Sequence, residues 1–241
     1  MSQYGELKEI AWRCNMELPK LGLAIQTFGN ASAVDRKSGV IAIKPSGVPY
    51  AELRPEMIVI VALDNRIVEG ALRPSSDTRT HTLLYRHFSG IGGIVHTHSP
   101  HAVAWAQAGR PVPILGTTHA DHLAFDIPCT GRMTDAMIRR NYEEETGNLI
   151  VKTFARKNAG DVPMVLVAGH GPFAWGATPE KAVYHSLMLE ELAKIAYLTL
   201  QINPRAPRLG RSLIRKHYQR KHGPESYYGQ TGSMQDKGEE P

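Results

Sequence analysis

Three histidines have a spacing that suits a metal site. His96 and His98 lie two residues apart in the apolar segment GGIVHTHS, and His170 ends a second apolar segment, VPMVLVAGH. Because side chains alternate between the faces of a strand, both imidazoles of the pair point the same way, and an adjacent strand would present the third beside them. Three neutral imidazoles favour zinc or a neighbouring transition ion and leave positions open for substrate oxygens. The pattern therefore predicts a catalytic type of metal site.

The alternative interpretation is that these are ordinary structural histidines among the 11 in the chain. A buried strand has no packing reason to end in two imidazoles, however, because each needs hydrogen-bond partners once it leaves water. This favours the metal site. The other histidines, taken one at a time, are interpreted as solvated or structural: His81, His87, His101, His119, His122, His185, His217 and His222.

Two short serine-containing turns could bind an anion. They are KPSG, from Lys44 to Gly47, and PSSD, from Pro74 to Asp77. Hydroxyls and free backbone amides at a turn or a helix N-terminus bind phosphate well. Serine-rich turns are also common as caps and loops, so each motif gains weight only beside the predicted metal site.

Helices and strands that must position these residues alternate along the whole chain. Helical patterns cover Leu7 to Leu18, DTRTHTLLYRHF, PHAVAWAQAG, Thr134 to Arg156, and a long segment that begins at Thr178. Strands are predicted for AIQTFGN, GVIAIKPSG, MIVIVALD, RIVEG, GGIVHTHS, PVPILGTT and VPMVLVAGH, whereas GPFAWG is interpreted as a turn-rich segment. Elements that mix in this way without a linker indicate one α/β domain.

Composition limits the class of protein. The chain has 241 residues, and its polar start and lack of about 18 successive apolar residues argue against a signal peptide or membrane helix, so a cytoplasmic protein is expected. Cys14 and Cys129 form no CxxC pair, which excludes a cysteine-based zinc site. The net charge of +5 suits a small anionic substrate, and we find no nucleic-acid motif in the basic stretch from Arg205 to Lys221.

With these residues in view, the sequence resembles the L-ribulose-5-phosphate 4-epimerase family, a zinc-dependent branch of the class II aldolases. The likeness runs from about Leu7 to Gln230 and rests on TFGNASAVD, IKPSGV, PSSDT, GGIVHTHS, GTTHAD, IPCT, YEEETGN, HGPFAWG, RKHYQRKHG and YYGQ, in that order. It implies a three-layer α/β/α domain with a central, mainly antiparallel sheet over residues 1–230. Residues 231–241 are polar and are expected to form a disordered tail.

The resemblance also assigns roles to individual residues. It implies one zinc ion per chain, held by His96, His98 and His170 with Asp77 as the acidic residue at the metal. Asp121 and Tyr228 match the acid and base pair of the family. Substrate and phosphate positions correspond to Gly29, Asn30, Ser46, Gly47, Ser75 and Ser76. Second-tier positions correspond to Lys44, Glu143 and His217.

The implied reaction converts L-ribulose 5-phosphate to D-xylulose 5-phosphate by cleaving and re-forming the bond between carbons 3 and 4. Such epimerases serve L-arabinose or L-ascorbate breakdown as homotetramers whose sites lie at subunit interfaces. The alternative is an L-fuculose-phosphate type aldolase, which usually carries Glu near the position of Asp77. A non-catalytic protein like the adducin head would lack the metal ligands, and no membrane or nucleic-acid partner is expected. One departure from the family is Phe28, where Trp is frequent before Gly29.

Overall fold

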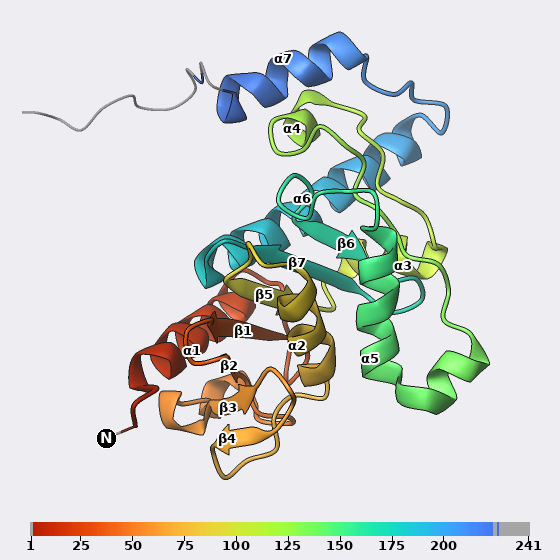
Figure 1. Ribbon diagram of the computed structural model, residues 1–241. Helices are drawn as coiled ribbons and strands as arrows, with labels where there is room; N and C mark the ends of the chain where they lie inside the picture. The colour runs from red at the N-terminus through yellow and green to blue at the C-terminus, as the bar shows by residue number, and fades with distance from the viewer. Residues whose placement is uncertain (1, 224–225, 227–241) are drawn as a thin grey trace, which may run out of the picture.

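The computed structural model describes residues 2–223 and residue 226 (Figure 1). The helices are α1 (Gly5–Lys20), α2 (Thr78–His87), α3 (Pro100–Ala108), α4 (Thr117–Ala120), α5 (Asp135–Thr153), α6 (Pro179–Ile202) and α7 (Arg211–His222). The strands are β1 (Asn30–Asp35), β2 (Val40–Ile43), β3 (Val59–Ala62), β4 (Ile67–Glu69), β5 (Gly93–His96), β6 (Met164–Leu166) and β7 (Pro172–Gly176). Two short 3-10 helices, η1 (Tyr50–Glu52) and η2 (Pro55–Met57), precede β3.

The strands of the described residues form one sheet in the order β4-β3-β2-β1-β5-β7-β6. Every neighbouring pair is antiparallel. Strand β1 lies at the centre between β2 and β5, and Asn30 pairs with His96 across the β1–β5 ladder. The first residue of one strand and the last of the other therefore meet at the same end of the sheet.

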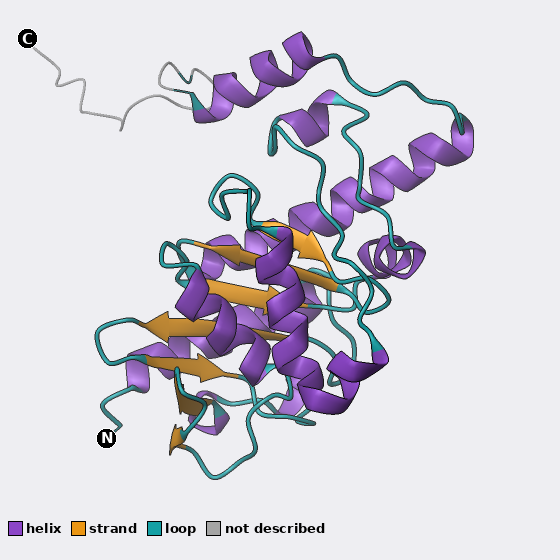
Figure 2. Cartoon of the chain, turned by 45° about the vertical axis from the view of Figure 1, so that its right-hand side comes forward, coloured by secondary structure: helices purple, strands orange, loops and turns teal. Residues whose placement is uncertain are grey.

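Helices cover both faces of this sheet (Figure 2). Cys14 of α1 and Val95 of β5 belong to one apolar cluster, which also includes the start of α6. Leu84 of α2 and Ile94 of β5 belong to a second cluster on the opposite face, together with α5. Neighbouring residues of β5 thus point into different helical layers, as the alternation of side chains requires. The prediction of a three-layer α/β/α domain is confirmed.

Capping residues explain where two of the long helices begin. The Thr178 hydroxyl accepts a hydrogen bond from the Lys181 amide, and Pro179 occupies the first helical position of α6. The Thr134 hydroxyl caps α5 in the same way through the Met137 amide. Both starts agree with the sequence prediction. None of the helices in the described ranges combines the length and the apolar character that a membrane span requires.

The predictions for three segments were wrong. The segment GPFAWG is not a turn but contains β7, which pairs with both β5 and β6. The segment PVPILGTT adds no strand to the sheet and makes only one isolated bridge, from Val112 to Ile127. The segment AIQTFGN stays irregular until Asn30. Helices α4 and α7, which the sequence patterns did not predict, pack together at one end of the molecule (Figures 1 and 2).

Candidate active site

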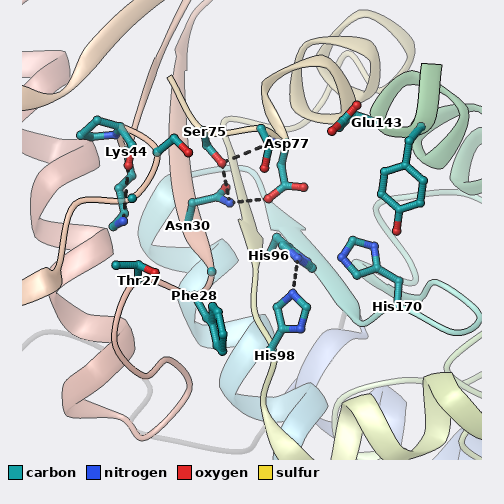
Figure 3. Close-up of a pocket in the computed structure, with 16 residues that line it drawn as sticks. Thr27, Phe28, Asn30, Lys44, Ser75, Asp77, His96, His98, Glu143 and His170 are labelled. Atoms are coloured by element: carbon teal, nitrogen blue, oxygen red, sulfur yellow. Dashed lines mark hydrogen bonds between the residues drawn. The ribbon is translucent and has the colours of Figure 1, made fainter. Parts of the chain in front are cut away.

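A cleft of about 340 Å³ opens where β1 begins, β5 ends and α2 begins. It brings together twelve of the residues predicted from the sequence (Figure 3). These are Gly29, Asn30, Lys44, Ser46, Gly47, Ser75, Ser76, Asp77, His96, His98, Glu143 and His170. The cleft is also lined by Thr27, Phe28, Pro45 and Tyr142.

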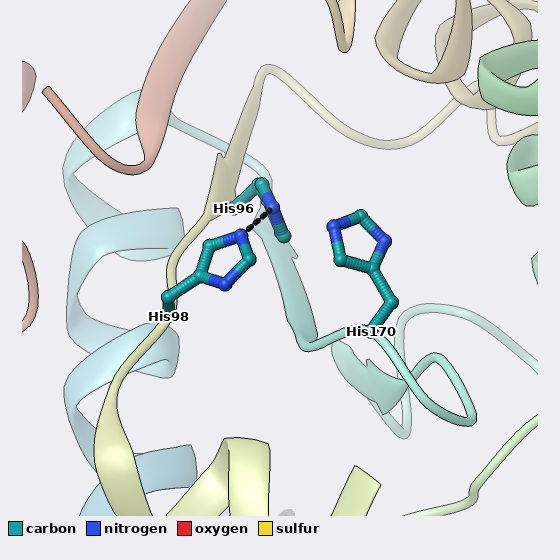
Figure 4. Close-up of side chains that lie close together, drawn as sticks. All are labelled: His96, His98 and His170. Carbon is teal, nitrogen blue, oxygen red and sulfur yellow. Dashed lines mark hydrogen bonds between the residues drawn. The ribbon is translucent and has the colours of Figure 1, made fainter. Parts of the chain in front are cut away.

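The three predicted histidines converge on one point of this cleft (Figure 4). Each of them offers a ring nitrogen, and these nitrogens all lie within 4.8 Å of one another. Their backbone positions differ in part from the prediction. His96 is the last residue of β5, but His98 lies beyond the strand, and His170 lies in the turn between β6 and β7 and not at a strand end.

The histidine cluster fits a metal cation. The Nδ1–H of His96 donates to the Pro172 carbonyl at 2.9 Å, which leaves Nε2 with its lone pair directed at His98. The His96 and His98 Nε2 atoms are 3.1 Å apart. Nitrogens bound about 2.0–2.1 Å from a tetrahedral ion lie roughly 3.3 Å apart. In addition, the buried Nδ1 of His170 has no hydrogen-bond partner within the described chain.

Electrostatics favours the neutral imidazoles that a metal needs. Burial lowers the pKa of His98, and the nearby His96 lowers it further. Burial and His96 likewise lower the pKa of His170. Both rings are therefore neutral at pH 7 and can donate a lone pair.

Asp77 lies beside the histidine cluster at the start of α2. Its carboxylate accepts a hydrogen bond of 2.7 Å from the Asn30 amide, which also donates to the Ser75 hydroxyl at 3.1 Å. Burial alone would raise the pKa of Asp77, but His96, His81 and the Asn30 hydrogen bond outweigh it and hold the pKa below its ordinary value. Asp77 is thus an anion that faces the imidazoles, although its oxygens are not among the ligand atoms clustered within 4.8 Å.

The two serine turns lie side by side. Pro45 and Pro74 form an isolated antiparallel bridge, the Ser75 amide donates to the Lys44 carbonyl at 3.0 Å, and the Ser46 amide donates to the Arg73 carbonyl at 2.9 Å. The sequence predicted that backbone amides of the turns would be free to bind an anion. These two amides instead hold the turns together and are not free. The serine hydroxyls and Lys44 remain to bind one.

Lys44 is a buried cation on the wall of the cleft. Only 2% of its surface is exposed, and its Nζ contacts the Pro45 carbonyl at 3.4 Å and lies 4.9 Å from the centre of the Tyr50 ring. Burial lowers the pKa of Lys44 to about 8. An ammonium held this far from water has a strong preference for an anionic ligand.

A glycine is required at position 29 because the backbone there lies very close to the backbone of His96. Its φ is +77°, and a Cβ at this position would lie 2.8 Å from the His96 carbonyl oxygen. The glycine therefore lets the start of β1 lie directly against the histidine-bearing end of β5.

Tyr142 is a site residue that the sequence reasoning missed. Asn141 has non-helical torsion angles that kink α5, and the next residue turns its ring toward His170, with the two ring centres 5.9 Å apart. Burial raises the pKa of Tyr142, so its hydroxyl is protonated and can donate into the cleft. Tyr142 adjoins the predicted Glu143 in the motif YEEETGN, which was the available signal.

Comparison with known proteins agrees with this fold. The family model described as Class II Aldolase and Adducin N-terminal domain matches residues 9–197. The chain belongs to this family.

Solved structures show the same class II aldolase fold. An L-fuculose 1-phosphate aldolase is 24% identical, with a TM-score of 0.78 over 91% of this chain and 97% of the other. The L-fuculose-1-phosphate aldolase from Thermus thermophilus is 27% identical, with a TM-score of 0.63 over 84% and 98% of the chains. A sugar-phosphate aldolase from Thermotoga maritima is 18% identical, with a TM-score of 0.62 over 83% and 97%.

Two residues predicted for the site, Asp121 and His217, do not line the cleft of their own chain. Asp121 follows α4, and its carboxylate accepts hydrogen bonds from His217 at 2.9 Å and from the Arg220 guanidinium at 3.0 and 2.8 Å, both on α7. Burial would raise the pKa of Asp121, but the bonds from Arg220 and His217 outweigh it and lower the pKa. Tyr228 and the predicted disordered tail, residues 231–241, lie outside the described residues.

Proposed function

We propose that this class II aldolase family member is a zinc-dependent L-ribulose-5-phosphate 4-epimerase. The observation that carries the proposal is one cleft that holds a cluster of three imidazoles beside the buried ammonium of Lys44. A metal site next to an anion site suits a sugar phosphate. The choice of epimerase rests on the sequence motifs: Asp77 in place of Glu, and Asp121 and Tyr228 in GTTHAD and YYGQ.

In this proposal His96, His98 and His170 hold the ion, which supplies Lewis-acid polarisation of a substrate carbonyl when it is bound. Lys44 holds the phosphate with the hydroxyls of Ser46 and Ser75, which line the same cleft. Tyr142 adds a protonated hydroxyl on the side of His170.

Direct inversion at carbon 4 is difficult because its hydrogen is not acidic, so the proposed route breaks a carbon–carbon bond. A base removes the proton of the carbon 4 hydroxyl, the bond between carbons 3 and 4 breaks, and its electron pair forms an enediolate on carbons 2 and 3. The phosphorylated aldehyde then rotates, the bond re-forms on its other face, and the carbon 4 oxygen regains a proton. Asp121 and Tyr228 are proposed to serve the two faces.

Because Asp121 does not line the cleft of its own chain, we propose that it acts in the cleft of a neighbouring subunit of a homotetramer. Co-expressed Asp121→Asn and His170→Ala chains are then expected to form mixed tetramers with about a quarter of wild-type activity, because each site combines halves from two subunits at random. Activity would be measured on purified mixed tetramers.

The matched control is co-expression of Asp121→Asn with His217→Ala. Both changes damage the same half of the site, so no activity should return. Equal failure to recover in the two mixtures would contradict the shared site.

The second candidate is a sugar-phosphate aldolase that releases its aldehyde, which the fuculose-phosphate aldolase structures favour. The test incubates purified protein and L-ribulose 5-phosphate with and without a chelator. We expect chelator-sensitive formation of D-xylulose 5-phosphate without free aldehyde. If L-ribulose 5-phosphate is not converted but L-fuculose 1-phosphate releases aldehyde, the aldolase assignment replaces the epimerase.

A further inference from the structure

Helix α2 and strand β1 are joined by polar side chains inside an apolar layer. The N-cap residue Asp77 is followed at intervals of four by His81 and Tyr85 of α2, and Asn30 and Ser32 lie two apart on β1. These spacings put each set on one face of its element. We call these five residues the β1–α2 seam.

Short contacts connect the seam along its length. The Ser32 hydroxyl lies 2.7 Å from His81 Nδ1 and 2.9 Å from the Tyr85 hydroxyl, and the Tyr85 hydroxyl also reaches the Ser32 carbonyl at 3.1 Å. At the end nearer the cleft, the Asn30 amide donates to Asp77 at 2.7 Å. Tyr85 does not line the cleft, so the seam extends from the site into the core.

The buried polar groups of the seam stabilise the packing of α2 on β1 less than apolar side chains would. His81 and Tyr85 are 0% exposed and Ser32 is 1% exposed, and His81 Nε2 has no hydrogen-bond partner among the described residues. An unpaired buried polar atom destabilises a fold, whereas apolar groups of similar shape would pack without that cost. Stability alone therefore does not account for these side chains.

Directional bonds do something that apolar packing does not: they fix the position of α2 along β1. That position sets where the Asp77 carboxylate lies, because Asp77 is the N-cap residue directly before α2. Asn30, which holds Asp77, pairs with His96 in the β1–β5 ladder. Strand β1 therefore positions both groups: it pairs with the strand that carries His96, and Ser32 on β1 binds His81 and Tyr85 of α2.

We propose that Ser32, His81 and Tyr85 are positioning residues that hold the Asp77 carboxylate at the histidine cluster and so strengthen metal binding. This inference relies on the proposed metal site but not on the identity of the sugar phosphate. Removing a group that orients a metal ligand without itself touching the metal typically lowers metal affinity or activity by about 10–100-fold.

The decisive variant is Tyr85→Phe, because it deletes one oxygen that lies outside the cleft. Titration of apo protein with Zn²⁺, in competition with a chromophoric chelator, is expected to show affinity lowered about tenfold. The control is Leu84→Val, which removes one buried methylene group from the apolar layer of the same helix. It should lower the denaturant concentration at which the protein unfolds and leave zinc affinity unchanged.

A second pair of variants keeps the test independent of folding. His81→Asn can present a polar atom near the place of Nδ1 and should retain most of the zinc affinity, whereas His81→Leu should lose it. Zinc affinity equal to wild type in both Tyr85→Phe and His81→Leu would overturn the proposal. Because the titration needs no substrate, it decides the role of the seam even if the epimerase assay fails.

Discussion

Replacing His170 with alanine is expected to release the metal and to lower turnover by about a thousandfold. Lewis-acid stabilisation contributes several kcal/mol to the transition state, and about 1.4 kcal/mol corresponds to a factor of ten. With His170 removed, only His96 and His98 remain in the cluster of three. Two imidazoles are fewer than the three protein ligands of typical catalytic zinc sites. Metal content after gel filtration and the initial rate would both be measured.

The fold should tolerate this change, because His170 is only partly buried and lies in a turn. His87→Ala is the control: its Nδ1 lies 2.9 Å from the Leu83 carbonyl, at the end of α2 far from the cleft. His87→Ala should retain both metal and activity. A His170→Ala protein that keeps one ion per chain and full activity would remove this histidine from the site.

The residues that line the cleft could be predicted from the sequence better than the backbone that carries them. The HxH pair and the serine turns marked the cleft correctly because they depend on residue type and close spacing. The histidines nevertheless converge from one strand end, one loop and one turn, which periodicity in the sequence does not reveal. Tyr142 enters the site through a kink at Asn141, a local break that the helical pattern hides.

The wrong predictions for GPFAWG and PVPILGTT have a similar cause. In GPFAWG the leading glycine and proline resemble a turn, yet a proline is accepted as the first residue of a strand, and Pro172 occupies that position in β7. In PVPILGTT the β-branched and apolar residues resemble a strand, but two prolines flank Val112, and only one bridge forms there. Whether a segment joins the sheet depends on strands far away in the sequence with which it can pair, and the local sequence does not identify them.

Lys44→Met is expected to raise the KM for a sugar phosphate about a hundredfold, because removing one partner of a buried charge pair costs about 2–5 kcal/mol of binding. The apo protein should become more stable, since methionine fills the space without the cost of burying an ammonium. Opposite changes in binding and stability distinguish a ligand-binding lysine from a structural one. Lys37→Met, at an exposed position between β1 and β2, is the control and should change neither.

The same lysine predicts a pH dependence. The pKa of Lys44 is lowered to about 8 by burial, so the free enzyme loses this positive charge as the pH rises through 8. Only the protonated form attracts the phosphate, and kcat/KM should therefore fall above pH 8 in the wild type. In Lys44→Met this fall should disappear, because no group titrates at that position. A wild-type profile that stays flat from pH 7 to about 9.5, beyond the shifted pKa but below the ordinary value for lysine, would contradict phosphate binding by Lys44.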